Sequence, residues 1–211
     1  MSAHELNWFN LMQTVLEMRG GAFMAQMLES KETLGSKRSM GRMDCALLYA
    51  LVRTFRPRIA VETGSNTGMA SAFILKGMHD AEIGDGKLHG IEYDTNVQIG
   101  SMIPAELRGS FVPCPGNVRG FMREQLGPGE IDFFLHDSMH RYRHQYWEFK
   151  HFWKRLRPGG LLVSHDVNMN GAFVDFVSKT YAHDWSGVSV PGKTQHTHWA
   201  RWGNLGFMVK A

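Results

Sequence analysis

The pattern of apolar and polar positions divides the chain into helical segments and strand segments. Over residues 4–19 the apolar positions recur at helical spacing, and a Gly-Gly pair then ends the pattern. A short second helix is predicted over 22–28, and a polar segment leads from it to a helix over 43–55. We therefore expect an N-terminal helical cap over 1–42, outside the core sheet, and a larger domain over 43–211.

Short apolar runs bounded by glycine, proline or polar residues predict the strands of a buried sheet. The runs fall at 59–61, 89–94, 110–112, 131–137 and 161–167. Helical spacing returns between and after these runs, at 69–75, 96–107, 121–126, 141–156 and 171–181. Strands that alternate with helices in this way predict an α/β fold with a doubly wound, mostly parallel sheet.

The end of the chain departs from this alternation. Two strands are predicted, at 188–190 and 205–209, and they are joined by a long loop without a helix. Strands connected in this way pair antiparallel, so a C-terminal hairpin is expected. A nicotinamide-binding domain is not expected to end in such a hairpin.

Aromatic side chains gather in two segments. The helix over 141–156 places an aromatic and aliphatic face toward the sheet, formed by Tyr142, Tyr146, Phe149, Trp153 and Leu156. The loop from Trp185 to Gly203 also contains His196, His198, Trp199 and Trp202. Indole rings in this loop would suit the apolar side of a sugar or an aromatic ring, and core packing explains them equally well.

Composition and charge narrow the possible partners and compartment. With 211 residues, 43% of them hydrophobic, the chain buries one good core and leaves no room for a second catalytic domain. The formal charge of +3 is spread without a basic run, so nucleic acid is not an expected partner. Cys45 and Cys114 have no disulfide or metal spacing. The first residues lack a basic segment followed by an apolar one, and no apolar run approaches the roughly 20 residues that span a bilayer, so no leader or membrane span is expected. A cytoplasmic protein without a membrane partner is expected.

Methionines are frequent near the N-terminus, at positions 12, 18, 24, 27, 40 and 43. Methionine is a flexible apolar residue that lines variable pockets and also fills irregular cores. The N-terminal helices could therefore cover a substrate, pack on the sheet, or join two copies into a homo-oligomer.

The residues that follow the first predicted strand form a glycine-punctuated turn, VETGSNTG at 61–68. Glycines allow a ligand to approach the backbone, and the helix that follows offers unpaired N–H groups. The spacing is G-x-x-x-G with an acid, Glu62, just before Gly64, whereas a dinucleotide-binding turn normally reads G-x-G-x-x-G. A second acid, Glu92, ends the second strand, where a carboxylate can accept hydrogen bonds from both hydroxyls of a ribose.

These two stretches resemble the class I S-adenosylmethionine-dependent methyltransferases over roughly 43–211. The resemblance implies a Rossmann-like, seven-stranded sheet and a bound S-adenosylmethionine. It implies that Glu92 holds the ribose and that the adenine amine meets Asn117 and Val118. It also implies that the methionine part of the cofactor is held by the first turn: Glu62, Gly64, Ser65, Asn66 and Gly68.

Two later stretches, HDSMHRY at 136–142 and VSHDV at 163–167, resemble the branch that includes macrolide-sugar O-methyltransferases. In that branch acids bind a magnesium ion that grips two adjacent oxygens of the acceptor. The resemblance makes Asp137, His165 and Asp166 metal ligands, and one imidazole among them would shift the preference from Mg²⁺ toward Mn²⁺, Fe²⁺ or Zn²⁺. His140 is the expected general base, because imidazole titrates near neutral pH.

The expected function is therefore metal-assisted O-methylation of a small-molecule hydroxyl, on a sugar or vicinal diol. Asp137 could instead contact the cofactor alone, with no metal used. The remaining alternatives are a metal-independent methyltransferase with another acceptor, a nicotinamide-dependent oxidoreductase, and a non-catalytic cofactor-binding partner protein. His136 is interpreted as a core histidine and Cys114 as structural, and a zinc site at His140 and His144 is discounted because Arg141 replaces the expected glutamate.

Overall fold

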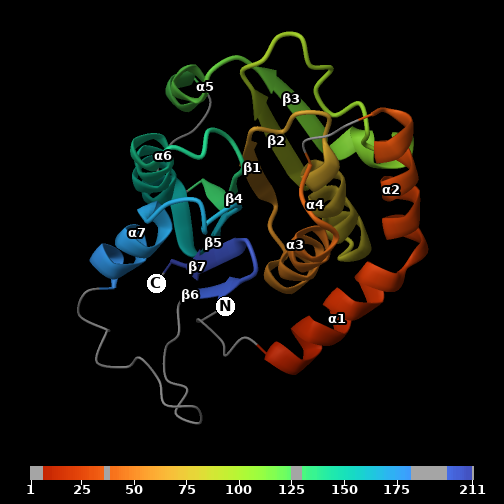
Figure 1. Ribbon diagram of the computed structural model, residues 1–211, viewed down its shortest axis with the longest axis horizontal. Coiled ribbons are helices and arrows are strands. Elements are labelled where there is room, and N and C mark those ends of the chain that lie inside the picture. Colours follow the sequence, from red (N-terminus) through yellow and green to blue (C-terminus); the bar gives the residue numbers. More distant parts are fainter. Residues whose placement is uncertain (1–6, 36–38, 125–129, 182–198, 211) are drawn as a thin grey trace.

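A central sheet separates two layers of helices (Figure 1). The computed structural model describes residues 7–35, 39–124, 130–181 and 199–210. The strands are β1 (Ile59–Thr63), β2 (Lys87–Glu92), β3 (Phe111–Pro115), β4 (Ile131–His136), β5 (Leu156–Ser164), β6 (Trp199–Trp202) and β7 (Leu205–Val209). The helices are α1 (Trp8–Gly20), α2 (Ala22–Thr33), α3 (Arg42–Phe55), α4 (Met69–Asp80), the 3₁₀ helix η1 (Ala105–Ser110), α5 (Val118–Glu124), α6 (Tyr142–Arg155) and α7 (Ala172–Thr180).

The strands lie in the order β3-β2-β1-β4-β5-β7-β6. β1 pairs parallel with both β2 and β4, and β7 pairs antiparallel with both β5 and β6. The predicted α/β class, the parallel core and the C-terminal antiparallel hairpin are confirmed. The partner of β7 in the hairpin is β6, whereas the strand predicted at 188–190 lies outside the described residues.

The strand order reverses between β1 and β4. From β1 the chain continues to β2 and β3 on one side, and from β4 it continues to β5 on the other side. In open parallel sheets ligands bind beyond the carboxyl ends of the strands at such a point. Glu62 lies near the end of β1, Glu92 ends β2, and Asp137 and His165 directly follow β4 and β5. The topology therefore brings the predicted site residues to one edge of the sheet.

Each face of the sheet has its own hydrophobic core. Helices α1–α4 cover one face and α5–α7 the other (Figure 1), and alternate residues of β4 point to opposite sides: Phe133 packs with α3 and α4, Phe134 with α6. Methionines of the N-terminal segment are buried in the first core at positions 18, 24, 27 and 40, and those at 12 and 43 pack against it. This placement favours the packing interpretation of these residues. Among the described residues, no helix combines the length and apolar character needed to cross a bilayer.

The helix predicted over 96–107 is wrong. The chain runs through turns there until η1 begins at Ala105. Gly100 has a left-handed φ of +72°, and Pro104 lacks the N–H that a continuing helix requires. Both residues interrupt the helix despite the apolar spacing.

Several strand boundaries also differ from the prediction, and β1 and β2 span 59–63 and 87–92 where 59–61 and 89–94 were predicted. β3 continues through two prolines to Pro115, which is possible because β3 is an edge strand and its outer N–H groups need no partner. β5 begins at Leu156, so the RPGG segment expected to precede it lies inside the strand, where the register against β4 shifts. β4 and β5 end at His136 and Ser164, which leaves Asp137, His165 and Asp166 on the loops that follow.

The buried face of α6 was predicted only in part. Phe149 is buried as expected, but Tyr142 is 40% exposed, and the other buried residues are Gln145, Glu148 and Phe152. Two polar side chains thus share the face that packs on the sheet. Their partners explain why, as described below.

Candidate active site

The glycine turn after β1 packs against the loop after β4. Gly64 has a φ of +83°, and a Cβ there would overlap the carbonyl oxygen of Asp137. Gly68 has a φ of +94° and begins α4, and a Cβ there would lie 2.8 Å from the Cα of Gly100. Only glycine combines this conformation with so little space. The turn that was predicted to hold the cofactor is therefore fixed directly against the loop that holds Asp137.

Glu62 is a fully buried carboxylate behind this turn. Its Oε2 accepts hydrogen bonds from the hydroxyls of Ser65, at 3.1 Å, and Ser71. Its Oε1 is buried and has no hydrogen-bond partner among the described residues. Burial raises the pKa of Glu62 to about 7, against the lowering effect of the two hydroxyls. An unpaired buried acceptor is costly, so this oxygen is suited to a donor group of a bound molecule.

Glu92 connects the end of β2 to the glycine turn. Its Oε2 accepts a hydrogen bond from the backbone N–H of Asn66, at 2.9 Å, and its Oε1 accepts one from the N–H of Asp94, at 2.9 Å. Asn66 itself has a left-handed φ of 47°. Each carboxylate oxygen can accept more than one hydrogen bond, so these contacts leave Glu92 able to accept from ribose hydroxyls as well.

Asn117 and Val118 follow β3 on the same edge of the sheet. Asn117 is exposed, and its Oδ1 accepts a hydrogen bond of 2.9 Å from the N–H of Gly120 in the first turn of α5. Val118 is 8% exposed and packs in the core on the α5 side. Their role beside an adenine stays a prediction.

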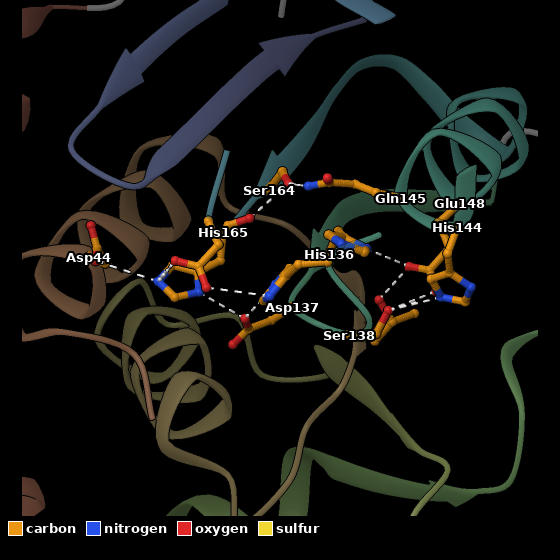
Figure 2. Close-up of polar contacts among 12 residues, drawn as sticks. Asp44, His136, Asp137, Ser138, His144, Gln145, Glu148, Ser164 and His165 are labelled. Atoms are coloured by element: carbon orange, nitrogen blue, oxygen red, sulfur yellow. Dashed lines mark hydrogen bonds and ion pairs between the residues drawn. The ribbon is translucent and has the colours of Figure 1, made fainter. Parts of the chain in front are cut away.

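Asp137 and His165 meet where β4 and β5 end (Figure 2). His165 Nδ1 lies 2.9 Å from Asp137 Oδ1, and His165 Nε2 lies 3.6 Å from Oδ2 of Asp44, a residue of α3. Burial opposes the positive charge of His165, but the contacts with Asp137 and Asp44 outweigh this effect and raise the pKa of His165 to about 10. Burial likewise opposes ionisation of Asp137, but the neighbouring imidazoles of His140 and His165 lower its pKa. The site is therefore built to hold positive charge between carboxylates.

His140 completes this group. Its Nε2 lies 3.5 Å from Asp137 Oδ1, and its Nδ1 lies 3.4 Å from Asp166 Oδ2. Ligand atoms of Asp137, His140 and His165 all lie within 4.8 Å of one another, which is close enough for one metal ion. The sequence assigned the metal to Asp137, His165 and Asp166. Geometry among the described residues groups Asp137 and His165 with His140 instead.

A second polar network lies beside this group, on the α6 side of the sheet (Figure 2). Its centre is the buried carboxylate of Glu148, whose Oε2 accepts from the hydroxyl of Thr63 at 2.7 Å and lies 2.8 Å from His136 Nδ1. Its Oε1 accepts from the hydroxyl of Ser138 at 2.9 Å and lies 2.7 Å from His144 Nε2. Burial opposes its charge, but these contacts hold the pKa of Glu148 well below its usual range.

Sequence reasoning missed Asp44, Ser138, Gln145 and Glu148. The only signal for the last two is that polar residues fall at helical spacing with the buried Phe149 and Phe152. His136 is confirmed as a core histidine, and His144 pairs with Glu148. Cys45 and Cys114 are free cysteines, and Cys114 is half-buried on β3, away from the end of β4.

One protein-family model matches the chain, and its description is Methyltransferase domain. The match covers residues 61–167, from β1 to just beyond the end of β5. It therefore includes the glycine turn, the Glu148 network and the Asp137 group, but not Asp44. Among curated proteins, no sequence matches this chain.

Solved structures with a similar fold cover nearly the whole chain. An O-methyltransferase from Bacillus cereus in complex with SAH is 15% identical, covers 96% of this chain and 97% of its own, and gives a TM-score of 0.64. The O-methyltransferase TomG from Streptomyces achromogenes, involved in tomaymycin synthesis and solved with SAM, is 16% identical, covers 97% of each chain and gives a TM-score of 0.63. At these identities the likeness shows the fold.

Proposed function

The chain belongs to the family of methyltransferase domains, and from this premise we propose that it is an O-methyltransferase. It transfers the methyl group of S-adenosylmethionine to a hydroxyl of a small molecule, a sugar or another vicinal diol. The observation that carries the proposal is the group of Asp137, His140 and His165, which stands against the glycine turn at the switch point of the sheet.

The residues around the glycine turn fit S-adenosylmethionine. Gly64 and Gly68 leave room for close approach to the backbone, and Glu62 Oε1 offers an unpaired buried acceptor to a donor group of the methionine part. Glu92 supplies acceptors for the ribose hydroxyls. Asn117 and Val118 are proposed to meet the adenine.

The acceptor hydroxyl must lose its proton for the methyl group to be transferred. An alcohol has a pKa of about 16, so near neutral pH its oxygen needs a base, a cation, or both. A divalent metal held by Asp137 and His165, with Asp166 as the ligand proposed from the sequence, would stabilise the alkoxide when bound. His140, proposed as the general base, stands 3.5 Å from Asp137, beside the same oxygen.

The choice of a vicinal diol rests on the resemblance of 136–142 and 163–167 to the macrolide-sugar branch. A cation held by Asp137 and His165 would bind and orient the oxygens of such an acceptor. Of the residues expected to line the acceptor site, Trp185, His196 and His198 lie outside the described residues. Trp199 and Trp202 belong to strand β6, so this end of the predicted loop is a strand. Exposed apolar residues of α1, among them Phe9 at 70% and Leu16 at 55%, support the further proposal of a homo-oligomer.

The alternatives predict different ligands. An oxidoreductase should bind a nicotinamide dinucleotide and not S-adenosylhomocysteine. A non-catalytic partner protein should bind S-adenosylhomocysteine but transfer no methyl group to any hydroxyl. A metal-independent enzyme should keep its activity after treatment with a chelator.

The test is transfer of labelled methyl from S-adenosylmethionine to a panel of acceptors, with binding of S-adenosylhomocysteine measured by calorimetry on the same sample. The panel pairs each vicinal diol with the analogue that lacks one of the two hydroxyls. We expect the diol to be methylated at least about 10-fold faster than its analogue. An acceptor held through one oxygen is less well oriented than an acceptor held through two. Equal rates would contradict the diol proposal, and absence of both binding and transfer would contradict the proposed function.

A further inference from the structure

We infer that His140, and not Asp166, is the third protein ligand of the cation at this site. The ligand set is then two imidazoles and one carboxylate, which selects a transition-metal ion over Mg²⁺. The inference rests on the proposed function, because it specifies the cation that would act on the same acceptor hydroxyl. It also gives His140 a role different from that of a general base.

The first argument is the convergence of the three ligand atoms. His165 Nδ1 and His140 Nε2 both face Oδ1 of Asp137, at 2.9 Å and 3.5 Å. His140 Nε2 is buried and makes no hydrogen bond with any described residue. A buried ring nitrogen without a partner is costly unless a ligand or ion occupies the space before it. A cation beside Asp137 would satisfy it.

The second argument is that the opposite nitrogen of each ring is backed by another carboxylate. Asp166 Oδ2 lies 3.4 Å from His140 Nδ1, and Asp44 Oδ2 lies 3.6 Å from His165 Nε2. Metal-binding histidines almost always donate their second N–H to a carboxylate or carbonyl, which fixes the ring and its tautomer. In both rings of this site a carboxylate lies at ion-pair distance from the second nitrogen, where such a partner would stand.

The position of Asp166 supports a backing role. Asp166 Oδ1 lies 3.6 Å from His165 Nε2, so its two oxygens face the outer nitrogens of both rings. Its backbone is left-handed, with a φ of 51°. Asp166 therefore holds the two histidines in place and is a positioning residue.

The ligand types decide the preferred metal. Mg²⁺ prefers oxygen ligands, whereas imidazole suits Zn²⁺, Fe²⁺ and Co²⁺, and two histidines with one carboxylate form known sites for Fe²⁺ and Zn²⁺. If His140 binds the metal through Nε2 and donates from Nδ1 to Asp166, neither nitrogen can accept a proton from the acceptor. The metal alone would then lower the pKa of the hydroxyl.

The test uses the full chain, freed of metal by a chelator and saturated with S-adenosylhomocysteine. Calorimetric titration with Co²⁺, Zn²⁺ and Mg²⁺ should give tighter binding of Co²⁺ and Zn²⁺ than of Mg²⁺. In the Co²⁺ complex, proton NMR should show two exchangeable, strongly shifted imidazole N–H signals, one for each ligating histidine. Binding of S-adenosylhomocysteine in the same sample tests the cofactor site independently of the metal.

Three variants separate the ligand from its support. His140→Ala should lose more than about 100-fold in Co²⁺ affinity and one of the two shifted signals, because a ligand is removed. Asp166→Asn should lose only about 10- to 100-fold and keep both signals, as expected for an outer partner. His140→Asp should bind again, with its preference moved toward Mg²⁺. His79→Ala, at an exposed histidine of α4, is the control and should bind like the native chain.

The inference is overturned if His140→Ala binds Co²⁺ as the native chain does, or if the native complex shows a single shifted signal. It is also overturned if no metal binds while S-adenosylhomocysteine does, and in that case the methyltransferase function itself still stands. Failure to bind S-adenosylhomocysteine would instead contradict the proposed function. Unchanged affinity for S-adenosylhomocysteine in each variant shows that the variant is folded.

Discussion

Two groups of carboxylates and imidazoles stand side by side at the end of β4, and they differ in how fully their members are satisfied. The two carboxylate oxygens of Glu148 make hydrogen bonds with four side chains, and the Glu148 side chain is only 1% exposed. Asp137 and His140 are each 18% exposed, and one nitrogen of His140 has no hydrogen-bond partner among the described residues.

The same residue types therefore serve two purposes. A buried charge whose partners are all present in the chain ties those partners together, so that removing one destabilises the fold, and it has nothing left to offer a ligand. A partly exposed group with an unused nitrogen is incomplete without an ion or substrate. We infer that the Glu148 network supports the sheet and that the Asp137 group performs the chemistry.

The largest expected effect separates the two groups by activity. His140→Ala should reduce kcat/KM for methyl transfer by about 10²- to 10⁴-fold, whether the ring binds the metal or acts as a base. The free energy of unfolding should change by only about 1 kcal/mol, the typical effect of a substitution outside the core. Steady-state kinetics and urea denaturation of the same preparation test both parts. A variant with normal kcat/KM would remove His140 from the active site.

For the Glu148 network the main expected effect is on stability. Glu148→Ala should lower the free energy of unfolding by about 3–5 kcal/mol, because it leaves the buried His136 and Thr63 without their acceptor. A change of this size lowers the melting temperature by about 2–4 °C per kcal/mol in a chain of this length. Thermal denaturation would measure it, with the exposed Glu32→Ala as the matched control. If Glu148→Ala melts like the control, the network is not structural.

A smaller effect is expected in the pH dependence of the free energy of unfolding, where two buried glutamates, Glu62 and Glu148, act in opposite directions. Glu62 has a pKa of about 7 in the folded chain, above its unfolded value of about 4.3, so between these values the folded state holds the proton that the unfolded state has lost. The stabilising contribution of Glu62 to the free energy of unfolding is full below about pH 4.3, and it falls by about 3 kcal/mol as pH rises to about 7. The pKa of Glu148 is lowered, so its contribution has the opposite sign and is lost as pH falls below about 4.3.

Urea denaturation of the ligand-free chain at pH 5 and pH 7 would test the Glu62 prediction. Glu62→Gln cannot ionise, so its free energy of unfolding should decline less between these two values than that of the native chain. Equal declines in the two proteins would show that burial does not raise the pKa of Glu62. The difference between the two proteins removes the contribution of all other titrating groups.

Local patterns predicted most of the fold. The strand–helix alternation gave the parallel sheet and the hairpin, because apolar periodicity reports which face of each element is buried. The errors fell where a single residue overrides the pattern. Pro104 and Gly100 interrupt a helix that the apolar spacing favours, and the prolines of β3 are tolerated only because that strand lies at the edge of the sheet.

The candidate site divides in the same way. Glu62, the glycine turn, Glu92, Asp137 and His165 could be identified from the sequence, because strand ends of a parallel sheet meet at one edge. Asp44 could not, because it lies on α3, far from the motifs in sequence, and reaches His165 only when α3 packs on the sheet. Glu148 could not either, because its position on α6 reads as part of an amphipathic helix.

By itself the sequence determined the class of fold, and it predicted that the glycine turn belongs to a cofactor site at the edge of the sheet where the candidate residues meet. These follow from short-range patterns, since periodicity and turn chemistry depend on residues close together in the chain. Only the tertiary structure decided which polar residues are satisfied and which are left open. That distinction depends on distances of a few ångströms between side chains from different elements, such as those that join His140 to Asp137 on one side and to Asp166 on the other.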